Sequence, residues 1–116
     1  MSVNTKYVFI ASMDVAPEKE ALFNEVYDTE HVPNLLKVPG VIAVTRLKTE
    51  PGNVSIGGEL RPVTGEGAPR YAAIYEIESP EVIASDAWAE AVEDGRWPAE
   101  VRPYTSNRQH IMRKVI

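Results

Sequence analysis

The chain of 116 residues contains no cysteine, which excludes disulfide bonds, zinc sites built on thiolates and a cysteine nucleophile. It also lacks any apolar run close to the roughly 20 residues that a membrane-spanning helix requires. Basic residues are outnumbered, with 12 Lys and Arg against 17 Asp and Glu, which argues against general nucleic-acid binding. We therefore expect neither a nucleic-acid partner nor association with a membrane.

Several functional motifs are missing as well. There is no GxGxxG sequence, no P-loop and no serine in a nucleophile elbow. The N-terminal residues do not form the charged, apolar and small-residue pattern of a signal peptide, so the expected location is the cytoplasm. What is present, 44% hydrophobic and 25% charged residues, is typical of a soluble globular protein. The length fits one domain, residues 1–116, with one core.

Apolar patterning and turn signals predict four strands and two helices in the order β-α-β-β-α-β. A first helix begins at Pro17 and a second at Ser79 and Pro80, with Ser79 as cap and Gly95 at the end. A connector, residues 96–103, precedes the last strand. The expected strands are residues 7–13, 41–47, 71–77 and an extended stretch from Tyr104, and the expected helices are residues 17–38 and 80–95.

This order predicts the α+β, ferredoxin-like fold, a four-stranded antiparallel sheet with both helices on one face. The strands are apolar on both faces, since Val8 and Ile10 alternate with Tyr7 and Phe9. A sheet face left bare by the helices would be a large exposed apolar patch. A second copy packed against it solves this problem, so we expect a homodimer.

The segment of residues 49–69 differs in composition from the rest. It contains five glycines and three prolines, which exclude a helix or a long strand and leave room for a small hairpin over residues 53–60. A loop of this length is usually a lid, a binding loop or an arm that reaches a partner. The alternative is a flexible surface loop without a function.

The first helix carries the most informative residues. At 100° per residue, Glu30 and His31 continue the apolar stripe that contains Val26 and Tyr27. Pro33 interrupts the helix beside them and is the expected first residue of a second short helix over residues 33–38. Two interpretations are open. The pair is a functional site, with the imidazole as acid or base, or it is structural, with His31 packed in the core and Glu30 bonded to a nearby N–H.

Residues 27–33, YDTEHVP, and residues 35–41, LLKVPGV, resemble the dimeric α/β-barrel superfamily, and most of all its EthD-like branch. The resemblance implies that two sheets form a barrel-like core in a dimer and that each subunit keeps a pocket near His31. Members include isomerases, cyclases, monooxygenases and haem-degrading enzymes. The long 49–69 loop differs from the compact members.

These observations predict a small enzyme without a cofactor that moves a proton next to a carbonyl in an apolar oxygenated or aromatic metabolite, by isomerisation, cyclisation, dehydration or decarboxylation. The alternative is a non-catalytic homodimer that binds such a molecule or serves as an accessory to another enzyme. We expect no metal site, although His31, His110, Glu30 and Asp28 are conceivable ligands. The candidate catalytic residues are His31, Tyr27 and Glu30, and the candidate substrate-binding residues are Arg46, Tyr71, Tyr75, Trp88, Trp97, Arg108 and His110.

Overall fold

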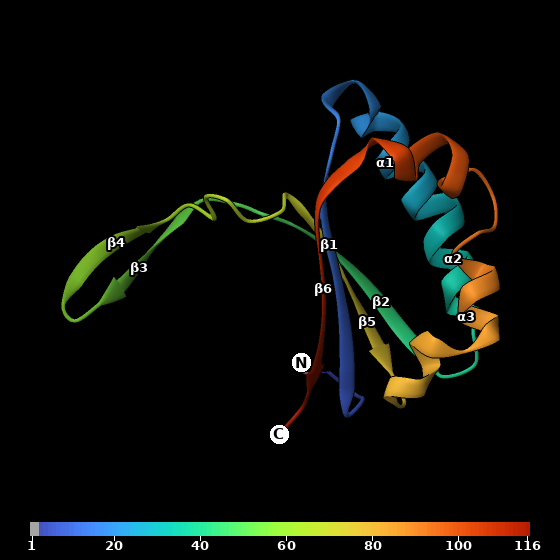
Figure 1. Ribbon diagram of the computed structural model, residues 1–116. Helices are drawn as coiled ribbons and strands as arrows, with labels where there is room; N and C mark the ends of the chain where they lie inside the picture. Colours follow the sequence, from blue (N-terminus) through green and yellow to red (C-terminus); the bar gives the residue numbers. More distant parts are fainter. Residues whose placement is uncertain (1–2) are drawn as a thin grey trace.

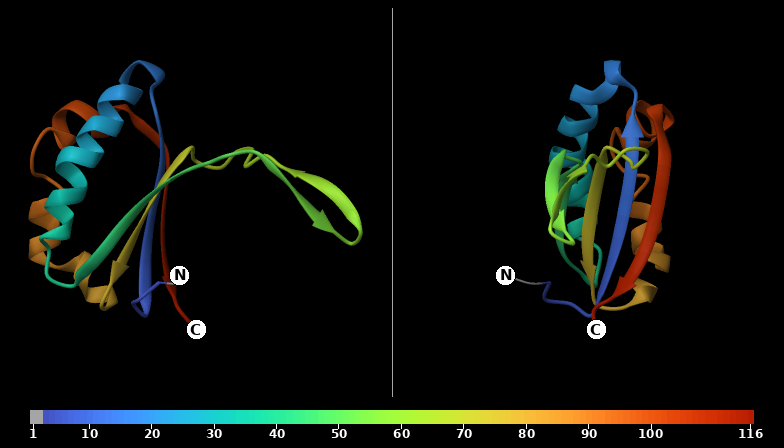
Figure 2. Two further views of the ribbon diagram at one scale, coloured as in Figure 1. Left: turned by 180° about the vertical axis from the view of Figure 1, so that it is seen from behind. Right: turned by 90° about the vertical axis from the view of Figure 1, so that its left-hand side faces the viewer.

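The computed structural model describes residues 3–116 and contains the ferredoxin-like arrangement predicted from the sequence. Four strands form one antiparallel sheet in the order β2-β5-β1-β6, and the helices cover one of its faces (Figures 1 and 2). The two central strands, β1 and β5, are the most buried, as their runs of β-branched and aromatic residues require. The strands are β1 (Tyr7–Val15), β2 (Val41–Lys48), β5 (Tyr71–Ile77) and β6 (Thr105–Lys114).

The first helical region is continuous and contains one irregular turn. A 3₁₀ turn (Pro17–Lys19) leads into α1 (Glu20–Val26), a π-helical turn (Tyr27–His31) follows, and α2 (Val32–Leu36) completes it. The expected break at Pro33 is therefore a widened turn within the helix, because the chain stays helical on both sides of it. Proline has no N–H to donate to the preceding turn, which favours such a local rearrangement.

The second helical region differs from the prediction of one helix capped by Ser79. A 3₁₀ turn (Pro80–Ala84) comes first, and α3 (Asp86–Ala91) begins only after Ser85, whose backbone is extended. Ser85 caps α3, since its Oγ accepts a hydrogen bond from the backbone N–H of Trp88 at 3.2 Å. The expected connector is also helical, with a π turn (Trp97–Val101) and a 3₁₀ turn (Arg102–Tyr104).

The hydrophobic core lies between the helices and the sheet. Its largest fully buried side chains come from both layers: Tyr75, Phe23, Leu35, Ile77, Val26 and Val101. The opposite sheet face carries no helix, and its centre is a row of three isoleucines on adjacent strands, because Ile10 of β1 pairs with Ile74 of β5 and with Ile111 of β6. Leu47 of β2, 46% exposed, extends the apolar surface toward the edge.

Residues 49–69 contain a two-stranded ribbon that we call the arm, β3 (Gly52–Ile56) paired with β4 (Glu59–Val63). It is longer than the predicted hairpin. Gly57 and Gly58 join its strands with φ of 62° and 81°, the positive values that a tight type I′ turn needs. The arm projects away from the sheet on the side that carries no helix (Figures 1 and 2). All ten of its strand residues are exposed.

Gly40 provides a test of how tightly the turn before β2 packs. Its φ is 95°, and an added Cβ would collide with the side chain of Val82. We expect Gly40→Ala to lower the free energy of unfolding by roughly 2–4 kcal/mol, since it adds steric overlap to an unfavourable backbone conformation. Gly67→Ala is the control, because its φ of 81° is similar and nothing lies within 4 Å of the new Cβ. Equal losses for the two variants in urea unfolding would contradict the packing shown here.

Candidate functional site

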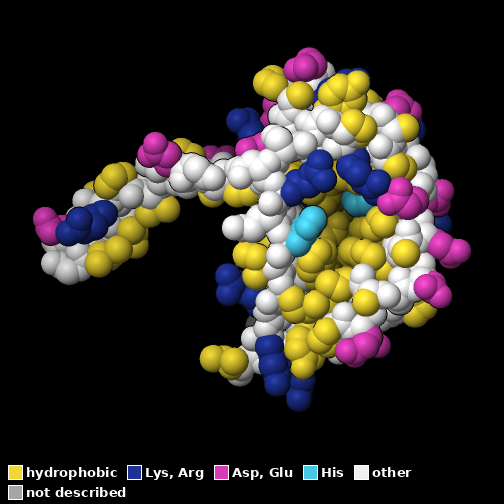
Figure 3. Space-filling model, viewed as in Figure 1, with side chains coloured by type: hydrophobic (Ala, Val, Ile, Leu, Met, Phe, Trp, Pro, Cys, Tyr) yellow, Lys and Arg dark blue, Asp and Glu magenta, His cyan; other side chains and the backbone are white. Residues whose placement is uncertain are grey.

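A pocket of about 310 Å³ opens between the sheet and the helices. Figure 3 shows it as a hollow with apolar walls, with basic and histidine side chains gathered along its upper part. Its volume lies at the lower end of the roughly 300–1,000 Å³ typical of small-molecule sites. The apolar walls are Phe9, Ala11, Met13, Leu35, Trp88, Val92 and Trp97, and the polar lining residues are Tyr27, His31, Tyr75, Arg102, Thr105, Arg108 and His110.

His31 ends the first π turn and is 5% exposed. Its ring stacks on the indole of Trp97, with centroids 4.3 Å apart and planes at 20°, and meets the edge of Tyr27 at 5.0 Å. Among the described residues, its Nδ1 is the only buried side-chain nitrogen or oxygen without a hydrogen-bond partner. A buried polar atom without a partner is costly, so this one calls for an explanation.

The protonation state of His31 follows from its surroundings. Burial lowers the pKa of the imidazole from 6.5 to about 4, and the positive charge of Arg102 adds to this effect. The ring is therefore neutral at pH 7. It begins any reaction as a proton acceptor, which narrows the predicted acid or base role to that of a base.

Tyr27 and Tyr75 form a hydroxyl pair in the pocket wall, with oxygens 2.9 Å apart. Burial raises the pKa of both phenols, so both are neutral at physiological pH. One hydroxyl donates to the other, which leaves one O–H proton outside the pair. The pair can therefore donate a hydrogen bond to an oxygen of a ligand.

Glu30 is placed as the structural interpretation expects, with its carboxylate bonded to a nearby N–H. It does not line the pocket, and its carboxylate accepts hydrogen bonds from the backbone N–H of Arg96 at 2.8 Å and from the Arg96 Nε at 2.5 Å. These bonds lower the pKa of Glu30. The guanidinium also bonds Glu25 at 2.9 Å. We call this Glu30–Arg96 contact the clamp, because it joins the π turn that carries His31 to the segment that carries Trp97.

Arg46 and Tyr71 also lie outside the pocket. With Asn24 they border a separate hollow of about 270 Å³ beside β2. The Arg46 guanidinium bonds Asp28 at 2.9 Å and Asn24 at 2.8 Å, and it lies over the ring of Tyr27 at 4.5 Å. Asp28 is thus held by Arg46, and no hydrogen bond within residues 3–116 joins it to the imidazole. In this structure Arg46 supports the pocket wall from outside.

The opening of the pocket carries Arg102, Arg108 and His110, which we call the rim. His110 packs against Phe9, with ring centroids 5.7 Å apart. Arg102 bonds both carboxylate oxygens of Glu93, at 3.0 and 2.6 Å, and the carbonyl of Val92. The structure therefore brings His31 and His110 to one cavity, although they are 79 positions apart in the sequence.

Five of the predicted substrate-binding residues meet His31 and Tyr27 around the pocket, namely Tyr75, Trp88, Trp97, Arg108 and His110. Sequence reasoning missed Phe9 and Met13, although the alternation of β1 puts both on one face. It also missed Arg102, for which the only signal was its place in the ordered-looking connector.

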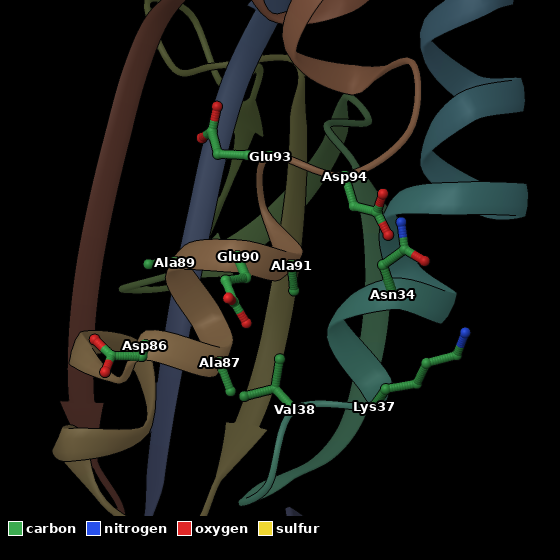
Figure 4. A pocket seen from close by; sticks show the side chains of 10 residues that line it. All are labelled: Asn34, Lys37, Val38, Asp86, Ala87, Ala89, Glu90, Ala91, Glu93 and Asp94. Atoms are coloured by element: carbon green, nitrogen blue, oxygen red, sulfur yellow. The ribbon is translucent and has the colours of Figure 1, made fainter.

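A larger hollow of about 880 Å³ lies between α2 and α3, and we do not regard it as the site. It has neither aromatic nor histidine lining residues, and Figure 4 shows its four carboxylates, Asp86, Glu90, Glu93 and Asp94, spread along α3 and the turn after it without converging. Within residues 3–116, no group of three histidine, aspartate or glutamate side chains is arranged to hold a metal ion. None of the described helices is long and apolar enough to cross a membrane.

Several solved structures resemble the chain, among them the following three. One, assigned as an antibiotic biosynthesis monooxygenase from Bordetella bronchiseptica, has 17% identity and a TM-score of 0.61 over 95% of this chain and 96% of that one. The haem degrader MhuD from Mycobacterium tuberculosis, with two haems in its active site, has 18% identity and a TM-score of 0.61 over 95% of each chain. An EthD family protein from Bacillus halodurans C-125 has 15% identity and a TM-score of 0.57 over 95% of this chain and 99% of that one.

No protein-family model matches the chain, and no curated protein matches it significantly. The structural likenesses establish the fold, which is the ferredoxin-like α+β arrangement of one four-stranded antiparallel sheet with helices on one face. The EthD protein, from the branch that the YDTEHVP motif resembles, is among the structures that share this fold. What these proteins bind or catalyse does not transfer to this chain at such low identity.

The buried imidazole predicts a specific dependence of stability on pH. Because the pKa of His31 is about 4 in the folded protein and near 6.5 when unfolded, the unfolded state takes up the proton first. The contribution of this group to stability should fall by about 3 kcal/mol as the pH drops from 6.5 to 4 and stay constant below that range.

Urea unfolding at several pH values measures this contribution. His31→Asn should remove that part of the pH dependence, whereas His110→Asn should keep it. If the His31→Asn curve has the same slope as the wild type between pH 6.5 and 4, the imidazole is not buried and neutral as described.

Proposed function

We propose that the protein is a small enzyme that binds an apolar, oxygenated aromatic metabolite in this pocket and moves a proton next to its carbonyl group, without a cofactor. The observation that carries the proposal is the unpartnered Nδ1 of His31 in a pocket built from aromatic side chains. A bound molecule would give this nitrogen a partner. An aromatic ring would also find flat apolar surfaces in Trp88 and Trp97.

In this proposal His31 is the base. A neutral imidazole accepts a proton from a carbon next to a carbonyl, and the resulting enolate lies beside the imidazolium. An imidazole with a pKa near 4 is a weak base on its own. The negative charge that forms on the substrate offsets the cost of charging the buried ring, so proton transfer becomes favourable only when a substrate is present.

The tyrosine pair supplies the hydrogen-bond donor for the substrate carbonyl. The O–H proton that Tyr27 and Tyr75 do not use between them is available to the substrate carbonyl. A neutral donor is needed here, and the raised pKa of both phenols keeps them protonated. A donor that strengthens its bond as the enolate oxygen forms stabilises the transition state more than the ground state. Glu30 acts as a positioning residue through the clamp.

A second candidate function is binding without catalysis. The close stacking of His31 on Trp97 and its lowered pKa favour it, because both describe a ring packed as a neutral hydrogen-bond acceptor. A protein of this kind would hold the same class of molecule and leave it unchanged.

Exchange of carbon-bound protons separates the two functions. In D₂O the enzyme should speed deuterium incorporation at the α carbon of 2-tetralone, an aromatic ketone, as followed by proton NMR. His31→Asn should reduce this rate by roughly 10²-fold or more, the usual contribution of a general base. Arg61→Gln, on the arm and outside the pocket, should keep the rate. Binding of the ketone without exchange above the buffer rate would contradict catalysis and favour the binding function.

We also propose that the protein is a homodimer joined through the sheet face that carries no helix. The row of Ile10, Ile74 and Ile111 supports this assembly, because it forms the centre of an apolar surface of the kind that dimers bury. The arm supports it as well, since it projects on the same side of the sheet and a second copy placed there would lie next to it (Figure 2).

Light scattering tests the assembly. The wild type should have about twice the mass of the 12.9 kDa chain at micromolar concentration. Ile74→Glu should give a folded monomer, because it places a charge in the centre of the interface. Leu36→Glu, at an exposed position on the helical side, should remain a dimer. A monomeric wild type, or a dimer that tolerates Ile74→Glu, would contradict this interface.

A further inference from the structure

The pocket differs in charge from the rest of the protein. The chain has 17 acidic and 12 basic residues, yet no aspartate or glutamate lines the pocket, while two arginines and two histidines do. Low-dielectric walls concentrate the field of the arginine charges in a cleft. The pocket therefore favours an anionic ligand, in contrast to the acidic surface around it.

The two arginines are not equivalent. Arg102 is paired with Glu93 through two hydrogen bonds, at 3.0 and 2.6 Å. For Arg108, no carboxylate of residues 3–116 lies within ion-pair distance, and its hydrogen bond to the Thr105 carbonyl is long, at 3.5 Å. The donors of its guanidinium are thus largely unused. A guanidinium binds a carboxylate through two parallel hydrogen bonds, which fixes the orientation of the ligand.

A local irregularity of β6 accompanies the placement of Arg108 on the pocket side. The pairing of β1 with β6 shifts register between Ser12 and Asp14, and Asn107 has a φ of 49°. Asn107 is fixed by a hydrogen bond of 3.1 Å from its side chain to Asp14. Bulges of this kind redirect side chains at the ends of strands. The irregularity therefore accompanies the position of Arg108 at the rim.

We propose that Arg108 is the anion-binding group of the pocket and that the ligand is an aromatic carboxylate, with its ring among the aromatic side chains and its carboxylate at the rim. This inference rests on the proposed function, which it deepens by naming the class of substrate. A carboxylate held at Arg108 would orient the ring so that one face or edge meets His31 and Trp97, which are stacked in the wall.

The two tryptophans of the chain make this inference testable, because both line the pocket. Their indole N–H signals in a ¹⁵N-labelled sample report on its occupancy. The probes are 2-naphthoate and 2-naphthamide, which share the ring and differ in charge. We expect both to shift the indole signals and the carboxylate to bind at least about tenfold more tightly.

Variants test whether Arg108 causes the difference in affinity between naphthoate and naphthamide. Arg108→Gln should reduce the affinity for naphthoate about tenfold, to that of the amide, and leave the affinity for the amide unchanged. Arg61→Gln removes the same charge from the exposed arm and should change neither affinity. Equal affinities of the two probes in the wild type, or equal losses in the two variants, would overturn the role of Arg108 and leave the proposed function standing. If neither probe shifted the indole signals, both the inference and the proposed pocket would fail.

Discussion

The pocket depends on one interaction, the clamp between Glu30 and Arg96. It joins two irregular helical segments that are far apart in the sequence, the π turn Tyr27–His31 and the π turn Trp97–Val101. One carboxylate accepts hydrogen bonds from both the backbone and the side chain of Arg96, so it fixes the position of the chain as well as that of one side chain. The stacking of His31 on Trp97 follows from this contact, because each ring is carried by one of the two segments. Gly95 belongs to the same arrangement, since a Cβ at this position would meet the carboxylate of Glu30.

The chemistry of the pocket follows from the burial of the His31 imidazole away from water. Stacking on Trp97 and contact with Tyr27 bury the ring, and burial disfavours its charged form. Arg102 acts in the same direction, because two nearby positive charges repel each other. The result is a neutral ring with one nitrogen that has no partner. A ligand that brings negative charge into the pocket, or develops it there, stabilises the protonated ring and also gives the buried nitrogen a hydrogen-bond partner. The properties of the pocket therefore favour an anionic ligand or an anionic intermediate.

The sequence predicted the fold and the inward position of His31 because both depend on local patterns. The alternation of β1 and the helical stripe through Val26 and Tyr27 placed the sheet, the helix and His31 correctly. Glu30 was assigned to the same stripe because sequence alone does not show that the backbone and side chain of Arg96, 66 positions away, bind its carboxylate. Arg46 was assigned to the substrate because sequence alone does not show that Asp28 and Asn24 already bind its guanidinium. Arg102 was missed because its position depends on a helical fold of the connector, and no periodicity indicates so short an element.

The central claim is that His31 is a neutral, buried imidazole whose Nδ1 is available to form a hydrogen bond with a ligand. ¹⁵N NMR of its ring tests this directly. The protein has two histidines, so a His110→Asn sample assigns the signals without ambiguity. The account predicts that the ring nitrogens of His31 keep the chemical shifts of a neutral imidazole from pH 8 down to pH 5, and that 2-tetralone moves the signal of Nδ1. Titration of His31 with a midpoint near 6.5, the value of an unperturbed histidine, together with no response to the ketone, would contradict it.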